Sequence, residues 1–226
     1  MKLMNLFEIF DPSNSMMMSL NWLSMFIIMM ILPYMYWIIP NRSMMMMYMF
    51  INFIFYEFKL LISIKYKINI IIFFNLMILI LTMNFIGLFP YIFTSTSQMS
   101  MNLSMALTLW MSFFLFSIWN KPLNTLAHFV PYNTPIQLMN FMSLIEFISS
   151  MIRPWTLSIR LSANMIAGHL LLSLLGNFIM NYFNILPLTI ISIFIQNMLM
   201  ILEISVAIIQ SYVFSILSLL YFIEMK

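Results

Sequence analysis

The chain has 226 residues, of which 64% are hydrophobic and only 7% are charged, with nine basic and six acidic side chains. Soluble domains carry roughly 25% charged residues, so the polar shell is missing here and lipid must cover most of the surface. The chain has no cysteine, which excludes disulfides, thiol chemistry and Cys-based metal sites. The basic residues are scattered and form no stripe with interleaved aromatics, which argues against nucleic acid as a partner.

The first predicted element is a transmembrane helix at 16–39, an apolar run long enough to cross about 30 Å of hydrocarbon. The next segment, 41–67, holds one acidic and four basic residues among its aromatics. That density of charge is too high for a span. We therefore expect an amphipathic helix lying in the plane of the membrane near 44–66.

Two further spans are predicted at 68–89 and 101–119. Between them lies an uncharged turn rich in serine and threonine, 94–100, so we expect the two spans to form a helical hairpin. The following segment, 120–135, carries Lys121 and several prolines and is predicted to be a loop.

The last two predicted helices, 136–175 and 185–225, are unusually long apolar stretches. At 1.5 Å per residue each could reach roughly 60 Å, about twice the hydrocarbon thickness, so we expect both to be strongly tilted. The predicted fold class is an all-α membrane protein with about five transmembrane helices and one in-plane helix, forming a single integral-membrane domain. Five spans also place the basic segment 41–67, Lys121 and the C-terminus on one side of the membrane.

Away from their ends, the two long stretches are interrupted by five acidic, basic or histidine residues: Glu146, Arg153, Arg160, His169 and Glu203. A charge at the bilayer centre costs at least about 2.5–3.5 kcal/mol, so such residues usually face a bundle interior or a water-filled cavity. Snorkelling toward the interface could explain Glu146 and Arg153, which lie in the first half of their stretch. It does not suit Arg160, because apolar sequence continues well beyond it.

Spacing indicates two polar stripes. Residues seven apart on an α-helix differ by about 20° around its axis, which aligns Glu146, Arg153 and Arg160, with Asn164 one turn further. His169 then points to the opposite face of that helix. The last helix carries Gln196, Glu203 and Gln210 at the same spacing.

The two long helices should pack antiparallel through a turn near Pro187. Residues whose numbers sum to about the same value then lie level. This register pairs His169 with Glu203, and Arg160 with Gln210.

The segment 160–169, RLSANMIAGH, resembles the RLxANxxAGH signature of subunit a of F-type ATP synthases. The segment 202–214, LEISVAIIQSYVF, resembles the second signature of that family, and Glu146 and the NFIGLFP run at 84–90 also match. His169 together with Glu203 is similar to the mitochondrial arrangement, whereas bacterial relatives tend to exchange the acid and the histidine.

The resemblance implies a stator subunit, not catalytic by itself, that forms two offset proton half-channels beside a rotating ring of c subunits in the mitochondrial inner membrane. Arg160 would face the ring carboxylates. Glu146 would line the matrix exit, and His169 with Glu203 the intermembrane entrance, while Asn164 and Gln210 would belong to the same proton path. The implied partners are the c-ring, other stator and membrane-sector subunits, and the lipid bilayer. No cofactor or metal is implied, Arg153 is given no role, and the C-terminus is expected on the matrix side.

Other functions remain to be weighed against this expectation. A subunit of respiratory complex I or an antiporter would usually show membrane lysines or helices broken by Gly and Pro, whereas no lysine lies inside a predicted span. A purely structural anchor would use the polar stripes for packing. Copper binding by the methionine runs is disfavoured, because no His or Cys lies beside these runs. Zinc or copper transport would need His128 and His169, which lie on separate segments.

Overall fold

The computed structural model describes most of the predicted helical region of the chain. The predicted first span, 16–39, lies largely outside the described residues. Those residues are 7, 10–13, 20–25, 39–61, 69–89, 92–130, 135–183 and 185–224.

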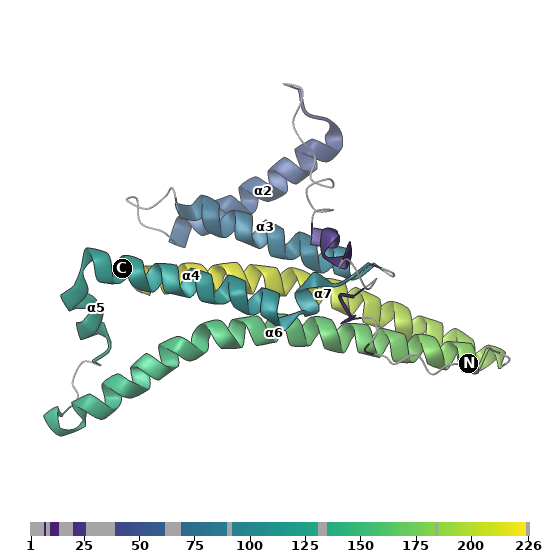
Figure 1. Cartoon of the computed structure of the whole chain (residues 1–226). Coiled ribbons are helices and arrows are strands. Elements are labelled where there is room, and N and C mark those ends of the chain that lie inside the picture. Colours follow the sequence, from purple (N-terminus) through teal and green to yellow (C-terminus); the bar gives the residue numbers. More distant parts are fainter. Residues whose placement is uncertain are drawn as a thin grey trace.

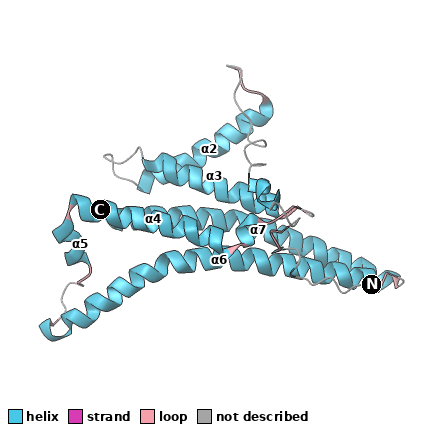
Figure 2. Ribbon diagram, viewed as in Figure 1, coloured by secondary structure: helices cyan, strands magenta, loops and turns pink. Residues whose placement is uncertain are grey.

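Every regular element in these ranges is a helix (Figure 2). Short 3-10 helices occur at Leu20–Leu23 (η2), Ser95–Ser97 (η4) and Ile136–Leu138 (η5). The α-helices are α2 (Arg42–Leu61), α3 (Ile70–Gly87), α4 (Met99–Asn120), α5 (Pro122–His128), α6 (Met139–Asn181) and α7 (Leu186–Glu224). The all-α prediction is confirmed.

Five of the described helices, α2, α3, α4, α6 and α7, are long and apolar enough to cross a membrane. α3 and α4 match the predicted spans within a few residues, and α6 and α7 are the two predicted long helices. α2 also meets the criterion of length and composition, so its placement in the membrane plane stays a prediction.

The predicted loop at 120–135 is wrong in part, because α5 occupies Pro122–His128. Proline is well suited to the first position of a helix, since its fixed φ fits and its missing N–H would have no partner there. α5 turns the chain between the end of α4 and the beginning of α6 (Figure 1).

The long helices α6 and α7 run antiparallel and lie side by side over much of their length, while the first part of α6 diverges from the bundle (Figure 1). α3 packs mainly against α7, and α4 mainly against α6. The predicted hairpin therefore packs chiefly on the long helices, which offer the larger apolar surface. One core cluster joins α2, α3 and α7, centred on Phe58, Phe73 and Leu219. A second joins α3, α4, α6 and α7, with Ile80, Leu161 and Phe214.

Serines occupy many buried positions of α6 and α7. Ser158, Ser211 and Ser215 have no exposed surface, and each hydroxyl donates a hydrogen bond to a carbonyl of its own helix. Small side chains let membrane helices approach closely, and the internal hydrogen bonds leave no hydroxyl donor unpaired. These residues explain how two helices of this length can pack without large apolar side chains at every contact.

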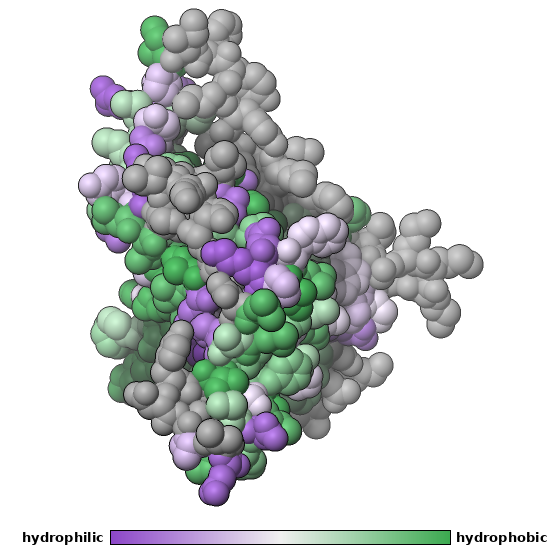
Figure 3. Space-filling model, turned by 90° about the vertical axis from the view of Figure 1, so that its left-hand side faces the viewer, coloured by the Kyte–Doolittle hydropathy of each residue, from purple (hydrophilic) through white to green (hydrophobic). Residues whose placement is uncertain are grey.

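The outer surface is mostly apolar. Figure 3 shows the end of the molecule near α5 and the chain's C-terminus, where hydrophobic residues predominate and hydrophilic ones gather in patches. In water such a surface would drive aggregation, whereas in a bilayer it meets the acyl chains.

Candidate proton-translocation site

The predicted site residues fall into three places along α6 and α7. His169 and Glu203 border a cavity of about 190 Å³ between these helices, which Asn164 and Gly168 also line. Leu88, after the end of α3, closes it from a third element. The structure thus brings His169 and Glu203 to one cavity, although no hydrogen bond joins them among the described residues.

Glu203 lies against the backbone of Gly168. A Cβ atom at Gly168 would come within 2.9 Å of both Cδ and Oε1 of the Glu203 side chain. Only glycine leaves room for the carboxyl group at this point of α6. Both carboxyl oxygens are buried, and no described residue donates a hydrogen bond to either of them.

His169 is half-buried and approaches two other parts of the chain. Its ring lies close to the backbone of Gly87 at the end of α3. Its ring meets that of Phe10 edge-on, with the centroids 6.3 Å apart. Phe10 is tied in turn to the α3–α4 connection, because Gln98 Nε2 donates a 2.7 Å hydrogen bond to its carbonyl oxygen. Phe10, which sequence reasoning did not connect with the site, therefore contacts it.

Asn164 and Gln210 connect α6 to α7 next to the cavity. Asn164 Nδ2 donates a 3.3 Å hydrogen bond to Gln210 Oε1. The predicted partner of Gln210 was Arg160, which lies one helical turn before Asn164 on α6. The observed partner of Gln210 is therefore one turn further along α6 than predicted. The antiparallel register itself is close to the prediction, since Glu203 lies against the neighbour of His169.

Arg160 lies on α6 with its side chain exposed. It makes no ion pair with any described residue, while its neighbours Leu157 and Leu161 are buried in the helix bundle. Arg160 is thus an exposed residue in the middle of a long apolar helix.

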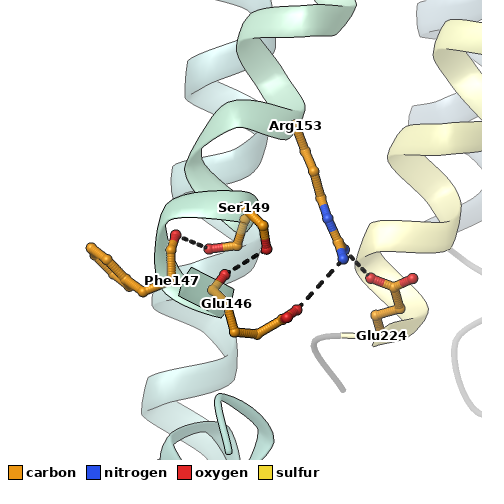
Figure 4. Close-up of polar contacts among 6 residues, drawn as sticks. Glu146, Phe147, Ser149, Arg153 and Glu224 are labelled. Atoms are coloured by element: carbon orange, nitrogen blue, oxygen red, sulfur yellow. Dashed lines mark hydrogen bonds and ion pairs between the residues drawn. The ribbon is translucent and has the colours of Figure 1, made fainter. Parts of the chain in front are cut away.

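Glu146 and Arg153 do not share the environment of Arg160, although spacing places all three on one stripe. Arg153 reaches across to the end of α7, where it donates a hydrogen bond to Glu224 (Figure 4). Its other terminal nitrogen lies 3.8 Å from Glu146 Oε1. The guanidinium also lies over the Tyr221 ring, 5.2 Å from the centroid.

Sequence reasoning missed Glu224. A signal was present, because Glu224 continues the spacing of Gln196, Glu203 and Gln210 after an interruption at Leu217. For a metal-transport function, the described residues offer no group of three His, Asp or Glu close enough to hold an ion. His128 is exposed on α5 and does not line the cavity beside His169.

The fold defines a multi-pass helical membrane protein, and its two long apolar helices carry ionisable side chains, as often occurs in membrane proteins that conduct ions or protons. The family model described as ATP synthase A chain matches residues 15–223. The chain belongs to this family, and is thus a multi-pass subunit of the membrane sector of ATP synthase in the mitochondrial inner membrane.

Insect relatives named ATP synthase subunit a are similar to the chain over nearly its whole length. The protein of Apis mellifera ligustica is 53% identical over 222 residues, covering 98% of this chain and 97% of the relative. That of Drosophila melanogaster is 47% identical over 225 residues, covering 98% and 99%. That of Anopheles gambiae is 47% identical over 224 residues, also covering 98% and 99%.

Proposed function

We propose that this chain is the proton-conducting stator subunit of the membrane sector, with two half-channels that meet at Arg160 beside a rotating ring of c subunits. The observation that carries the proposal is the outward exposure of Arg160, without a described counter-ion, on a long apolar helix. A fixed cation in that position can attract a carboxylate of another subunit that moves past it.

The chemistry of arginine suits this role. The guanidinium stays protonated under any physiological condition, and it favours the ionised form of a neighbouring carboxyl group. At 4 Å and an effective dielectric constant near 20, the attraction is about 4 kcal/mol. That is strong enough to make an arriving carboxyl group give up its proton and weak enough to release the carboxylate again. Protons would then have to travel on the ring.

The two proposed half-channels lie on opposite sides of Arg160 along α6. Glu146 is about 21 Å away along the helix and His169 about 13 Å in the other direction, from a rise of 1.5 Å per residue. The cavity beside His169 and Glu203 supports an entrance there, with Asn164 and Gln210 between it and Arg160. We assign Glu146 to the matrix exit, His169 and Glu203 to the intermembrane entrance, and the C-terminus to the matrix side. The spans form one integral-membrane domain.

The test is substitution of Arg160 in the whole ATP synthase. Arg160→Ala should abolish ATP-driven proton pumping and ATP synthesis while the complex still assembles. Arg160→Lys should rescue poorly, because an ammonium is compact, can lose its proton when desolvated and lacks the planar fork. Lys59→Ala, which removes another exposed cation from a membrane helix, is the matched control and should keep pumping. An assembled Arg160→Ala complex that still pumps protons would end the proposal.

The structural-anchor alternative expects the opposite pattern. Lysine would then serve nearly as well as arginine, and alanine would lower the amount of assembled complex. Measuring assembly and pumping in the same membranes separates the two.

A further inference from the structure

The ion-pair cluster at the end of α7 contains one cation and two anions. Glu146, Arg153 and Glu224 come from two helices that diverge at this end of the bundle (Figures 1 and 4). Their side chains are 34%, 32% and 46% exposed, so the cluster is neither deeply buried nor freely solvated. With both glutamates ionised its net charge is −1.

The guanidinium is shared unequally between the two carboxylates. Glu224 accepts a hydrogen bond from Arg153, whereas Glu146 Oε1, at 3.8 Å, is beyond hydrogen-bonding distance. Arg153 is also held by the Tyr221 ring, one turn before Glu224 on α7. Both contacts on α7 draw the guanidinium toward that helix and away from the Glu146 carboxylate.

We propose that Glu224 is a positioning residue for the proton path: by occupying Arg153, it keeps the carboxylate of Glu146 free to take up and release protons. This inference rests on the proposed function of Glu146 as a proton-exchanging group. A carboxylate bound by a guanidinium through two parallel hydrogen bonds is a poor proton carrier, because the proton must first displace a charge-assisted pair. Arg153 is close enough to Glu146 to form that pair if Glu224 releases it.

The groups around Glu146 are few. On its own helix Glu146 pairs with Arg153, and the groups of α7 that contact the same guanidinium are Glu224 and Tyr221. On the side of α5 the neighbouring residue Phe147 packs against the ring of Phe129, with the centroids 5.8 Å apart, and His128 beside Phe129 is exposed. Among the described residues, therefore, Arg153 is the only cation paired with Glu146.

The proposal predicts an unusual relation between two substitutions. Glu224→Gln should slow ATP-driven proton pumping about tenfold per assembled complex, the size expected for one added hydrogen bond between charged groups. Arg153→Gln alone should slow pumping less, because no guanidinium is then present to bind the Glu146 carboxylate. The double variant Glu224→Gln/Arg153→Gln should pump faster than Glu224→Gln. It removes the guanidinium that would bind the Glu146 carboxylate, and it returns the net charge of the cluster to −1.

A purely structural tie between α6 and α7 predicts no such recovery, because the second substitution cannot restore a lost tie. Slowing by Glu224→Gln without recovery in the double variant would overturn the inference, and so would pumping by Glu224→Gln at the normal rate. If the Glu224→Gln complex fails to assemble, Glu224→Asp, which keeps the charge, replaces it in the experiment. Glu224→Asp should slow pumping less than Glu224→Gln, and adding Arg153→Gln should again raise the pumping rate.

Two further variants separate this inference from the function on which it rests. Glu57→Gln, at a half-exposed glutamate of α2 outside the cluster, is the matched control and should pump normally. Glu146→Gln should lose pumping. If Glu146→Gln pumps normally, the proposed exit through Glu146 is wrong and the inference falls with it. If Glu146→Gln fails and the double variant shows no recovery, the inference alone is wrong.

Discussion

Arg153 and Arg160 show how surroundings separate two identical side chains on one helix. Arg153 is compensated by Glu146 and Glu224 and packs over an aromatic ring. Arg160, two turns further, is exposed and has no described ion-pair partner. A compensated guanidinium has little left to offer another subunit, whereas an uncompensated one can attract a carboxylate that approaches from outside. Under the proposed function, Arg160 would contact the partner subunit and Arg153 would act within the chain.

At the same scale, the contact between Gly168 and Glu203 predicts the effect of one methyl group. In Gly168→Ala the new Cβ would come within 2.9 Å of the Glu203 carboxyl group, so that flexible group must move out of its place. We expect proton pumping to fall several-fold while assembly is unchanged, because the backbone need not shift. Pumping and the amount of complex are both measured in inner-membrane vesicles.

Gly176→Ala provides the matched control, since nothing lies within 4 Å of a Cβ at Gly176. It should leave pumping intact, and alanine favours the helix by roughly 0.8–1.0 kcal/mol. Equal losses from the two substitutions would show that helix flexibility matters and that the position of Glu203 does not.

Spacing along a helix was the main source of predictions about single residues. The seven-residue interval predicted one stripe through Glu146, Arg153 and Arg160, because helix geometry converts spacing into a shared face, but it did not predict that Arg160 would lack the ion-pair partners of Arg153. The close approach at Gly168 was not predictable, since it depends on how two helices are rotated against each other. The partner of Arg153 was likewise hidden, because Glu224 lies on another helix.

At the scale of elements, the serines of α7 explain its close packing and give a second prediction. Ser215 has no exposed surface, and its hydroxyl bonds to Tyr212 of its own helix. Ser215→Leu adds bulk to a filled contact, and overpacking typically costs about 1–3 kcal/mol. We expect a lower temperature for dissociation of the membrane sector. Ser215→Ala should leave that temperature nearly unchanged, and similar losses from both variants would show that the hydroxyl matters more than the volume.

The sequence predicted elements well where a long apolar run defined them. α3, α4, α6 and α7 follow such runs, because length and hydropathy are sufficient to mark a membrane helix. α5 was missed because its seven residues are too few for a periodic apolar pattern. The way α3 and α4 pack was also not evident, since a short connection does not say which helix offers each of them the larger apolar face.

The ionisable residues of α6 and α7 lie at separate heights along this antiparallel pair of helices. A cavity with His169 and Glu203 lies on one side of Arg160, and the cluster of Glu146, Arg153 and Glu224 lies on the other. The antiparallel arrangement was predictable from the turn near Pro187, whereas the pairing of Gln210 with Asn164 depends on details of that turn. Between the two regions, Arg160 is the only Asp, Glu, His, Lys or Arg among the described residues of α6 and α7, which agrees better with the two separate aqueous paths of the proposed function than with one continuous pore.

This arrangement leads to a prediction of sidedness that uses the absence of cysteine in the chain. Ser149→Cys lies beside Glu146, and Leu171→Cys lines the cavity of His169 and Glu203. A membrane-impermeant thiol reagent should label Ser149→Cys only from the matrix side, in inverted vesicles, and Leu171→Cys only from the intermembrane side, in mitoplasts. Each path is expected to open to one compartment, because a group reachable from both sides would let protons cross without turning the ring. The unsubstituted chain cannot react and serves as the blank. Labelling of both positions from one side would rule out the assignment of the two half-channels, and labelling from the exchanged sides would reverse the proposed orientation of the whole subunit.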